Sequence, residues 1–264
     1  MKKIGLTLIM GLIWIISYAQ EQVIYTSKYL PKPDTTWVFT PKQWNGTEKL
    51  PAIILLHGYS GSYKQWDQIM GAQQYADEYN FVIICPDGLY NSWYLNSPVK
   101  SDWQFEDFFY KEFYPDVQKR KSVDPTQIFI TGLSMGGHGA MYLFSKKPEL
   151  FKSAGSTSGG VNLLDGVGKW GLNELLGSHD KADAVWQNYS VMHWIENLKG
   201  NAKPFIIDCG MDDFFYESNN KLKQITDALK LNATYISQPG NHSRTYWKKS
   251  IKQQFEFFKL LTKS

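Results

Sequence analysis

The sequence predicts an α/β fold in which a mostly parallel central sheet carries helices on both faces. Short continuous apolar runs, typical of strands buried on both faces, occur at residues 52–56, 81–85, 128–130 and 205–209. Segments with apolar residues at helical spacing lie between these runs, and strands that alternate with helices usually pair in parallel. The third observation is Gly132-Leu133-Ser134-Met135-Gly136, a G-x-S-x-G sequence between one of these strands and a helix.

Residues 1–19 have the features of a secretory signal peptide. Two lysines precede an apolar run from Ile4 to Ile16, and Ser17-Tyr18-Ala19 supplies small residues at the −3 and −1 positions. The run is shorter than the roughly 20 residues that span a bilayer, which disfavours an uncleaved membrane anchor. We expect cleavage after Ala19 and a mature chain, residues 20–264, that is secreted or periplasmic, forms one domain and has no stable membrane anchor.

Length and composition limit the number of domains and the classes of ligand that are expected. A length of 264 residues suits a single large α/β domain, and the sequence has no linker, internal repeat or low-complexity stretch. The net charge is +3 without long runs of one sign, so no nucleic-acid partner is expected. Aromatic residues make up 16% of the chain, and such a surplus also suits the stacking of sugar or aryl ligands.

The first part of the mature chain contains two strands that precede the buried ones. The segments Val23–Leu30 and Thr35–Thr40 alternate and are rich in β-formers, which predicts an antiparallel pair. A helix is expected from Tyr63 to Glu78, between the strands at 52–56 and 81–85.

A loop from Asp87 to Pro98 holds Trp93 and Tyr94 at its middle. Ser101 or Asp102 can cap the helix that follows. That helix has an aromatic stripe at helical spacing, which we assign to the core rather than to a ligand site: Phe105, Phe108, Phe109 and Phe113.

After the serine turn we expect a helix at Gly137–Lys146 and a strand at Phe151–Ser156. The pattern loosens from Gly159 to Gly200, with glycines, tryptophans and short helical fragments, which predicts an irregular cap beside the site. The remaining expected elements are the strand at 205–209, a helix at Glu217–Leu229, a strand at Thr234–Ser237 and a last helix with an apolar face at Trp247, Ile251, Phe255 and Phe258.

The chain has two cysteines, Cys85 and Cys209, each at the end of an expected strand. In the expected order these strands lie about four places apart, or roughly 19 Å at 4.8 Å per strand. A disulfide needs Cα atoms within about 7 Å. We therefore expect two buried free thiols, although export would permit a disulfide.

Ser134 is the candidate nucleophile. A serine on a sharp strand-to-helix turn projects its hydroxyl away from the backbone, and the glycines at 132 and 136 remove Cβ atoms that would clash there. The amide of Met135 then points to the space where an oxyanion would form, at the positive end of the helix dipole. A second amide donor is expected after the strand that ends at Leu56, where Gly58 allows a close approach and Tyr59 follows.

A serine nucleophile needs a neutral imidazole beside it and a carboxylate that orients the imidazole. The sequence has five histidines. His242 follows the last strand, in a loop at the edge of the sheet where ligand sites gather, and is the candidate base. We interpret His57 as a structural histidine in a loop. His138 lies one helical turn after Ser134 and is expected to pack along that helix, where it is badly placed to take the serine proton. No pattern supports His179 or His193.

The acid is expected between the serine and the histidine in the chain. Asp208, Asp212 and Asp213 cluster at the end of the strand at 205–209. Asp208 still belongs to the strand, whereas Asp213 lies in the loop and is the first choice. Asp212 is the runner-up, and helix capping is the structural alternative for this cluster.

Four stretches resemble the esterase D and feruloyl esterase group of α/β-hydrolases: LLHGYSG at 55–61, GLSMGGHGA at 132–140, GMDD at 210–213 and PGNH at 239–242. The stretch Asn91-Ser92-Trp93-Tyr94 is similar to the tributyrin and acetyl xylan esterases of that group. The resemblance spans about residues 35–260. It implies an α/β-hydrolase fold, a triad of Ser134, Asp213 and His242, and an oxyanion hole made by the amides of Tyr59 and Met135.

These features predict an exported serine carboxylic ester hydrolase that needs no metal or organic cofactor. Its expected substrates are short-chain acyl esters or acetyl and feruloyl esters on a polysaccharide. Trp93, Tyr94 and Trp170 are expected to line the cleft, with packing of the cap as the alternative. Three other functions stay open: acyl transfer to a sugar or lipid hydroxyl, carbohydrate binding without catalysis, and peptide hydrolysis. The group's formylglutathione hydrolases are typically cytosolic, so the signal peptide disfavours that activity.

Overall fold

The computed structural model describes residues 20–178 and 183–262, so the expected signal peptide at residues 1–19 lies outside the described residues. Within the described residues, eight strands form one sheet in the order β1-β2-β4-β3-β5-β6-β7-β8. Their bounds are β1 Gln20–Tyr25, β2 Asp34–Phe39, β3 Leu50–Leu56, β4 Val82–Pro86, β5 Val123–Gly132, β6 Ser153–Thr157, β7 Phe205–Gly210 and β8 Ala233–Gln238. The pairs β1–β2 and β2–β4 are antiparallel and the others are parallel, which confirms the mostly parallel sheet.

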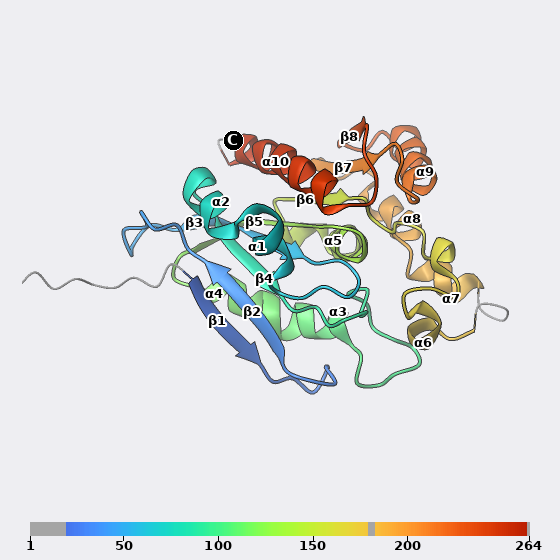
Figure 1. The fold of residues 1–264 in the computed structure, drawn as a ribbon, viewed down its shortest axis with the longest axis horizontal. Coiled ribbons are helices and arrows are strands. Elements are labelled where there is room, and N and C mark those ends of the chain that lie inside the picture. The colour runs from blue at the N-terminus through green and yellow to red at the C-terminus, as the bar shows by residue number, and fades with distance from the viewer. Residues whose placement is uncertain (1–19, 179–182, 263–264) are drawn as a thin grey trace, which may run out of the picture.

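Helices cover both faces of this sheet (Figure 1). One face packs against α1 (Gln65–Met70), α2 (Ala72–Tyr79) and α10 (Arg244–Leu261). The other packs against α3 (Phe105–Phe108), the π-helical turn η1 (Phe109–Phe113), α4 (Tyr114–Lys119), α5 (Met135–Lys146) and α9 (Tyr216–Ala228). Strand β3 shows why both faces are apolar. Its Ile53 and Leu55 enter the first core, whereas Ile54 and Leu56 enter the second, because successive side chains point to opposite faces.

The segment between β6 and β7 is the irregular cap that was expected. Its described residues form short helices: η3 (Leu163–Gly166), α6 (Leu172–Leu176), α7 (Asp183–Asn188), α8 (Val191–Trp194) and η5 (Ile195–Leu198). A further short turn, η2 (Pro148–Leu150), precedes β6. The helices α8 and η5 pack against α5, the helix that follows the serine turn (Figure 1). The cap is therefore attached next to the expected site.

Two expected helices differ from the structure. The helix at 63–78 is divided into α1 and α2 because Gly71 adopts the left-handed conformation, with φ of 73°. The Asp67 carboxylate accepts the Ala72 amide at 2.8 Å and so helps to start the second helix. The helix expected to be capped by Ser101 or Asp102 begins only at Phe105, without a side-chain cap. Its aromatic stripe is buried in the core, as predicted.

The two cysteines are free and buried, as predicted. Strands β4 and β7, which carry Cys85 and Cys209, are four places apart in the sheet. Burial raises the pKa of both thiols above the ordinary value. In the described part of the chain, none of the helices combines the length and apolar character that crossing a bilayer requires.

Candidate active site

Ser134 lies between the end of β5 and the start of α5, in a strained turn. Its φ is 55°, a conformation that residues other than glycine rarely adopt. Its amide donates to the Thr157 carbonyl at 3.0 Å, and its carbonyl accepts from the His138 amide at 3.0 Å. A Cβ at Gly136 would lie 2.1 Å from the Leu56 carbonyl oxygen, so the motif glycine is needed for the helix to approach β3.

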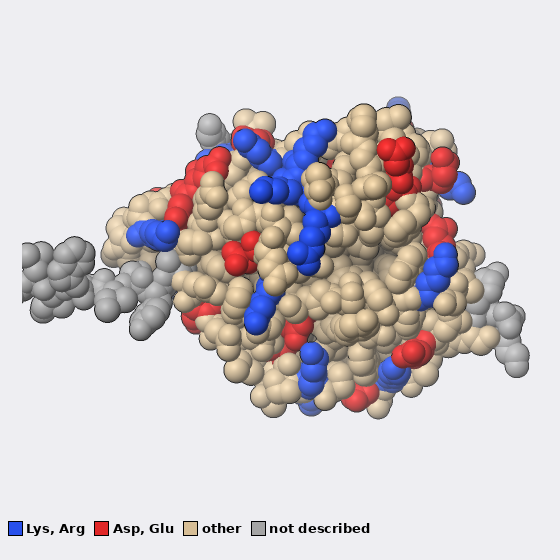
Figure 2. Space-filling model, viewed as in Figure 1, with Lys and Arg blue, Asp and Glu red and all other residues tan. Residues whose placement is uncertain are grey.

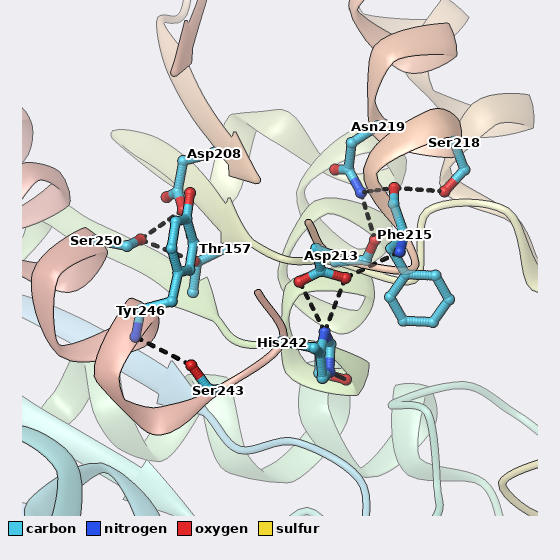
Figure 3. A network of polar contacts seen from close by, with 12 residues as sticks. Thr157, Asp208, Asp213, Phe215, Ser218, Asn219, His242, Ser243, Tyr246 and Ser250 are labelled. Carbon is cyan, nitrogen blue, oxygen red and sulfur yellow. Dashed lines mark hydrogen bonds and ion pairs between the residues drawn. The ribbon is translucent and has the colours of Figure 1, made fainter. Parts of the chain in front are cut away.

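The structure brings Ser134, His242 and Asp213 together in series. His242 Nε2 lies 3.0 Å from Ser134 Oγ. His242 Nδ1 lies 3.0 and 2.9 Å from the two carboxylate oxygens of Asp213, and Figure 3 shows these two side chains facing each other. The Asp213 side chain is fully buried, and that of His242 is 15% exposed. An alcohol, an imidazole and a carboxylate in this order can activate a serine as a nucleophile.

The structure distinguishes between the two candidate acids, Asp213 and Asp212. Asp213 is buried beside His242 and also accepts the Phe215 amide at 2.9 Å, whereas Asp212 is exposed. The loops that carry acid and base touch directly, since a Cβ at Gly210 would lie 2.2 Å from the Gly240 carbonyl oxygen. The Gly-x-x-Asp spacing therefore matters because it lets the acid loop reach the histidine loop.

A buried polar network next to the triad joins the elements that position it. Asp208 accepts hydrogen bonds from Ser250, Thr157 and Gln254, each at 2.6 Å. Figure 3 shows Asp208 beside Ser250 and Thr157. Burial raises the pKa of this carboxyl above its ordinary value, against the effect of its hydrogen-bond donors. Because the Thr157 carbonyl holds the Ser134 amide, the network connects α10 and β7 to the serine turn.

The two amides expected to form an oxyanion hole both lie next to Ser134, one in the following residue and the other in the loop after β3. Neither the Tyr59 nor the Met135 amide donates to an acceptor among the described residues. Gln65 fixes the first of these loops, because its side-chain carbonyl accepts the Gly58 amide at 2.8 Å. A Cβ at Gly58 would lie 3.4 Å from Ser134 Cβ, so this loop passes directly beside the serine. Two unused N–H groups at this position can stabilise a negatively charged oxygen.

A cleft of about 270 Å³ opens over the serine. Its lining residues are Gly58, Tyr59, Gln65, Trp93, Leu133, Ser134, Trp170, Phe214, His242 and Trp247. Trp93 and Trp170 thus lie where the sequence placed them, and Trp93 Nε1 donates to the Trp170 carbonyl at 3.2 Å. Both have positive φ, which shows that the surrounding packing holds these loops.

Tyr94 is placed in the core and not in the cleft. Its side chain is fully buried, and its hydroxyl donates to the His57 carbonyl at 2.9 Å. A Cβ at Gly139 would lie 2.3 Å from the Tyr94 ring, so the ring packs against the serine helix. Adjacent residues in a tight loop point in different directions, and the sequence alone did not separate Tyr94 from Trp93.

Apart from Leu133 of the serine motif, three cleft residues were missed by the sequence analysis. Phe214 is 61% exposed, and its ring centroid lies 4.2 Å from that of His242. Trp247 also contacts the imidazole, with its ring nearly perpendicular to it and 5.1 Å between centroids. Gln65 is the third. Trp247 was assigned to the apolar face of the last helix, and only its position five residues after His242 hinted at the site.

The remaining described histidines do not reach Ser134. His57 is buried, with Nδ1 2.7 Å from the Gly58 carbonyl oxygen, and burial lowers its pKa to about 4. His138 is buried between the carbonyl oxygens of Trp93 and Tyr189, at 3.0 and 2.8 Å, and burial lowers its pKa to about 4 as well. His193 is exposed on the cap. His179 lies outside the described residues. In the part of the chain that the structure describes, no cluster of His, Cys, Asp and Glu side chains is arranged to hold a metal ion.

His138→Gln is expected to destabilise the protein less at low pH than at neutral pH. The pKa of His138 is about 4 when folded and about 6.5 when unfolded, so the unfolded chain binds the extra proton within this window. The wild type therefore loses stability as the pH falls through the window, and the variant is spared this loss. Urea unfolding should show the cost of the substitution shrinking by about 2–3 kcal/mol between about pH 7.5 and about pH 4.5.

The comparison of the two proteins also serves as the control for that measurement. Burial raises the pKa of Asp34 to about 7 and that of Asp208 above its ordinary value, which favours folding at lower pH. His57 acts in the same direction as His138. These groups are common to both proteins and cancel in the difference. An equal cost at both pH values would show that His138 is not held neutral.

The chain is similar to known esterases over most of its length. The model of the Esterase family matches residues 27–258. An acetyl esterase of Caldicellulosiruptor saccharolyticus is 27% identical over 89% of this chain and 96% of its own. An S-formylglutathione hydrolase of Mus musculus is 27% identical over 70% of this chain and 71% of its own.

Two further similarities concern an acyltransferase and a solved structure. A diacylglycerol acyltransferase/mycolyltransferase, Ag85B of Mycobacterium intracellulare, is 27% identical over 77% of this chain and 73% of its own. Among solved structures, a ferulic acid esterase superposes with a TM-score of 0.78 at 23% identity, covering 92% of this chain and 98% of the other. At that identity the structural likeness supports the α/β-hydrolase fold.

Proposed function

Because this chain belongs to the Esterase family and is a carboxylic ester hydrolase, we propose that it cleaves esters through an acyl-enzyme on Ser134. The contact of 3.0 Å between Ser134 Oγ and His242 Nε2 is the observation that carries the proposal. His242 takes the serine proton as Oγ attacks the ester carbonyl carbon, and it returns the proton to the leaving alcohol. Water then attacks the acyl group in the same way, which releases the acid and restores the serine.

Asp213 and the two free amides complete this reaction. Asp213 accepts the Nδ1–H of His242, so Nε2 is left as the base, and the carboxylate stabilises the imidazolium that forms. The amides of Tyr59 and Met135 would bind the oxygen that becomes negative in each tetrahedral intermediate. One such donor typically contributes about 2.7–4 kcal/mol to the transition state.

The cleft favours an uncharged acyl group of limited size. Its volume of about 270 Å³ is slightly below the usual range for ligand pockets, and four of its lining residues carry indole or phenyl rings. We propose acetyl and other short-chain esters, or acetyl and feruloyl esters carried by a polysaccharide, as the substrates. The names of the similar acetyl esterase and ferulic acid esterase agree with this range.

Acyl transfer is the second candidate reaction. The similarity to a mycobacterial acyltransferase favours it, because the same acyl-enzyme can be attacked by a sugar or lipid hydroxyl in place of water. Product analysis with an added alcohol acceptor separates the two reactions. Hydrolysis predicts that free acid stays the main product at low acceptor concentration.

Export is also part of the proposal and rests on residues 1–19, with their two lysines and short apolar run. The experiment measures the mass of the protein that is recovered outside the cytoplasm. We expect the mass of a chain that begins at Gln20. Recovery of the full-length chain from the cytoplasm alone would contradict export.

A substrate panel tests the proposed function. We expect turnover of p-nitrophenyl acetate, acetyl xylan or methyl ferulate at a higher kcat/KM than of S-formylglutathione, because the lining of the cleft is mostly aromatic and contains no lysine or arginine to bind the carboxylates of glutathione. Tributyrin extends the panel to a lipid-like ester. A preference for S-formylglutathione, or turnover of none of these compounds by the folded protein, would overturn the assignment.

A further inference from the structure

A second cavity, of about 540 Å³, lies between the cap and the α3–α5 face, apart from the cleft over Ser134. We propose that it binds neutral sugar units of a polysaccharide, an inference that rests on the proposed polysaccharide ester function. Its lining residues are Asn96, Pro98, Glu106, Tyr142, Lys146, Val185, Asn188, Tyr189, His193 and Trp194. None of them lines the cleft.

The position of the cavity suits a polymer. Tyr142 and Lys146 are on α5, eight and twelve residues after Ser134. At 1.5 Å per residue, they lie about 12 and 18 Å along the helix from the serine. A sugar chain of a few units covers that distance, so a polymer that presents an ester to Ser134 can also reach the cavity.

The floor of the cavity is polar but nearly neutral. Lys146 Nζ lies 2.5 Å from Glu106 Oε1, and the Tyr142 hydroxyl donates to Glu106 Oε2 at 2.9 Å. The ammonium also lies 4.8 Å from the Tyr142 ring centroid and 4.7 Å from that of Trp194. The lysine charge is therefore engaged within the cavity, whereas the carboxylate oxygens keep lone pairs that can accept from sugar hydroxyls.

The walls of the cavity supply aromatic rings for the apolar faces of a sugar ring and an amide donor for its hydroxyl groups. Trp194 and Tyr189 are half-buried aromatic residues, and Trp194 Nε1 donates to the Asn188 carbonyl at 2.5 Å, which fixes the indole. Asn96 Oδ1 accepts the Asp107 amide at 2.9 Å, so its Nδ2 group is left to donate to a ligand. Aromatic faces combined with amide donors and a carboxylate acceptor match the alternating apolar and hydroxyl surfaces of a pyranose.

The charge of the molecule argues for a neutral ligand here. Figure 2 shows Lys and Arg side chains gathered over α10, where Arg244, Lys248, Lys249 and Lys252 are exposed. A polyanion would be drawn to that surface, whereas the one lysine that lines the second cavity is half-buried and paired with Glu106. An acidic oligosaccharide therefore serves as the contrasting probe.

His138 connects the second cavity to the cleft. Its ring stacks on that of Tyr142, with centroids 5.4 Å apart, and Nε2 lies 2.8 Å from the Tyr189 carbonyl oxygen. Its Nδ1 lies 3.0 Å from the carbonyl oxygen of Trp93, a cleft residue. The two sites thus share a wall and keep a fixed geometry, as two subsites of one polymer require.

Trp194→Ala tests the cavity, with Trp44→Ala as the matched control. Trp44 is also half-buried and donates its indole N–H to a local carbonyl, that of Glu48 at 2.7 Å, but it lines neither cavity. Binding of the two probes, xylohexaose and cellohexaose, is measured by calorimetry. Both variants are made in the Ser134→Ala background, which excludes any contribution from ester turnover. We expect Trp194→Ala to weaken binding of the preferred hexaose about tenfold or more, and Trp44→Ala to leave it unchanged.

Kinetics on the active enzyme supply a second measurement. Trp194→Ala should lower kcat/KM for acetyl xylan about tenfold relative to kcat/KM for p-nitrophenyl acetate, mainly through KM. The proposal is overturned if Trp194→Ala and Trp44→Ala behave alike, if neither hexaose binds, or if trigalacturonate binds more tightly in a Trp194-dependent manner. Ester hydrolysis without Trp194-dependent sugar binding refutes the second site alone. Sugar binding without any ester hydrolysis refutes the esterase proposal and leaves this site standing.

Discussion

Ser134→Ala is expected to lower kcat for p-nitrophenyl acetate by about 10⁴-fold or more, since losses of this size follow removal of a nucleophile from such a triad. The alanine lacks the oxygen that attacks the ester, and neighbouring hydroxyls do not lie beside His242 Nε2 in the part of the chain that the structure describes. Initial rates at saturating substrate, for wild type and variant at the same pH, give the ratio. The residual rate reports what the free amides and the cleft achieve without the nucleophile.

Ser156→Ala is the matched control for this experiment. Ser156 is buried at the end of β6, close to the serine turn, and its hydroxyl has no hydrogen-bond partner among the described residues. Its removal should change kcat by less than about threefold, because no interaction is lost. A Ser134→Ala protein that keeps more than about a tenth of the wild-type rate would refute the nucleophile, given the usual size of triad losses.

The sheet and the serine turn were predictable from the sequence because each depends on neighbouring residues. Strands buried on both faces need unbroken apolar runs, and those runs fixed β3, β4, β5 and β7. The turn depends on glycine at 132 and 136, where a side chain would meet backbone atoms at 2.4 and 2.1 Å. Such local constraints leave a pattern in the sequence that can be read directly.

The rest of the site depends on contacts between distant segments. Phe214 covers His242, and Gln65 holds the Gly58 amide, only because the folded chain brings these loops together. The side chains of Trp93 and Tyr94 are neighbours in one loop, yet the first lines the cleft and the second enters the core. The helix expected at 63–78 was wrong for a related reason. The apolar pattern continues across Gly71, but the left-handed conformation of this residue divides the segment into α1 and α2.

Asp212 and Asp213 show the same limit at the centre of the proposed chemistry. Both follow Gly210 in the same turn, and their residue type and spacing are nearly equivalent. The close contact between the Gly210 and Gly240 backbones decides which carboxylate meets the imidazole, and only Asp213 lies within 3.0 Å of His242 Nδ1. The choice therefore rests on loop-to-loop packing and leads to a direct comparison of the two residues.

Asp213→Asn is expected to lower kcat by about 10³–10⁴, whereas Asp212→Asn should lower it by less than about threefold. The asparagine keeps the size of the buried side chain, and its Oδ1 can still accept the Phe215 amide, so the fold is retained. Its amide group then faces His242 Nδ1 with an N–H donor, which favours the tautomer that carries the proton on Nε2. That tautomer cannot take the proton of Ser134.

The paired variants distinguish orientation of the base from a general effect of charge near the cleft. Each removes one negative charge from the same turn, so a long-range effect of the charge of this turn on the cleft would lower both rates. A carboxylate that selects the tautomer of His242 affects the rate only from position 213, where both oxygens lie within 3.0 Å of Nδ1. Equal losses would refute selection of the tautomer by Asp213, and a larger loss in Asp212→Asn would move the acid to Asp212 and require the acid loop to adopt a different conformation during catalysis.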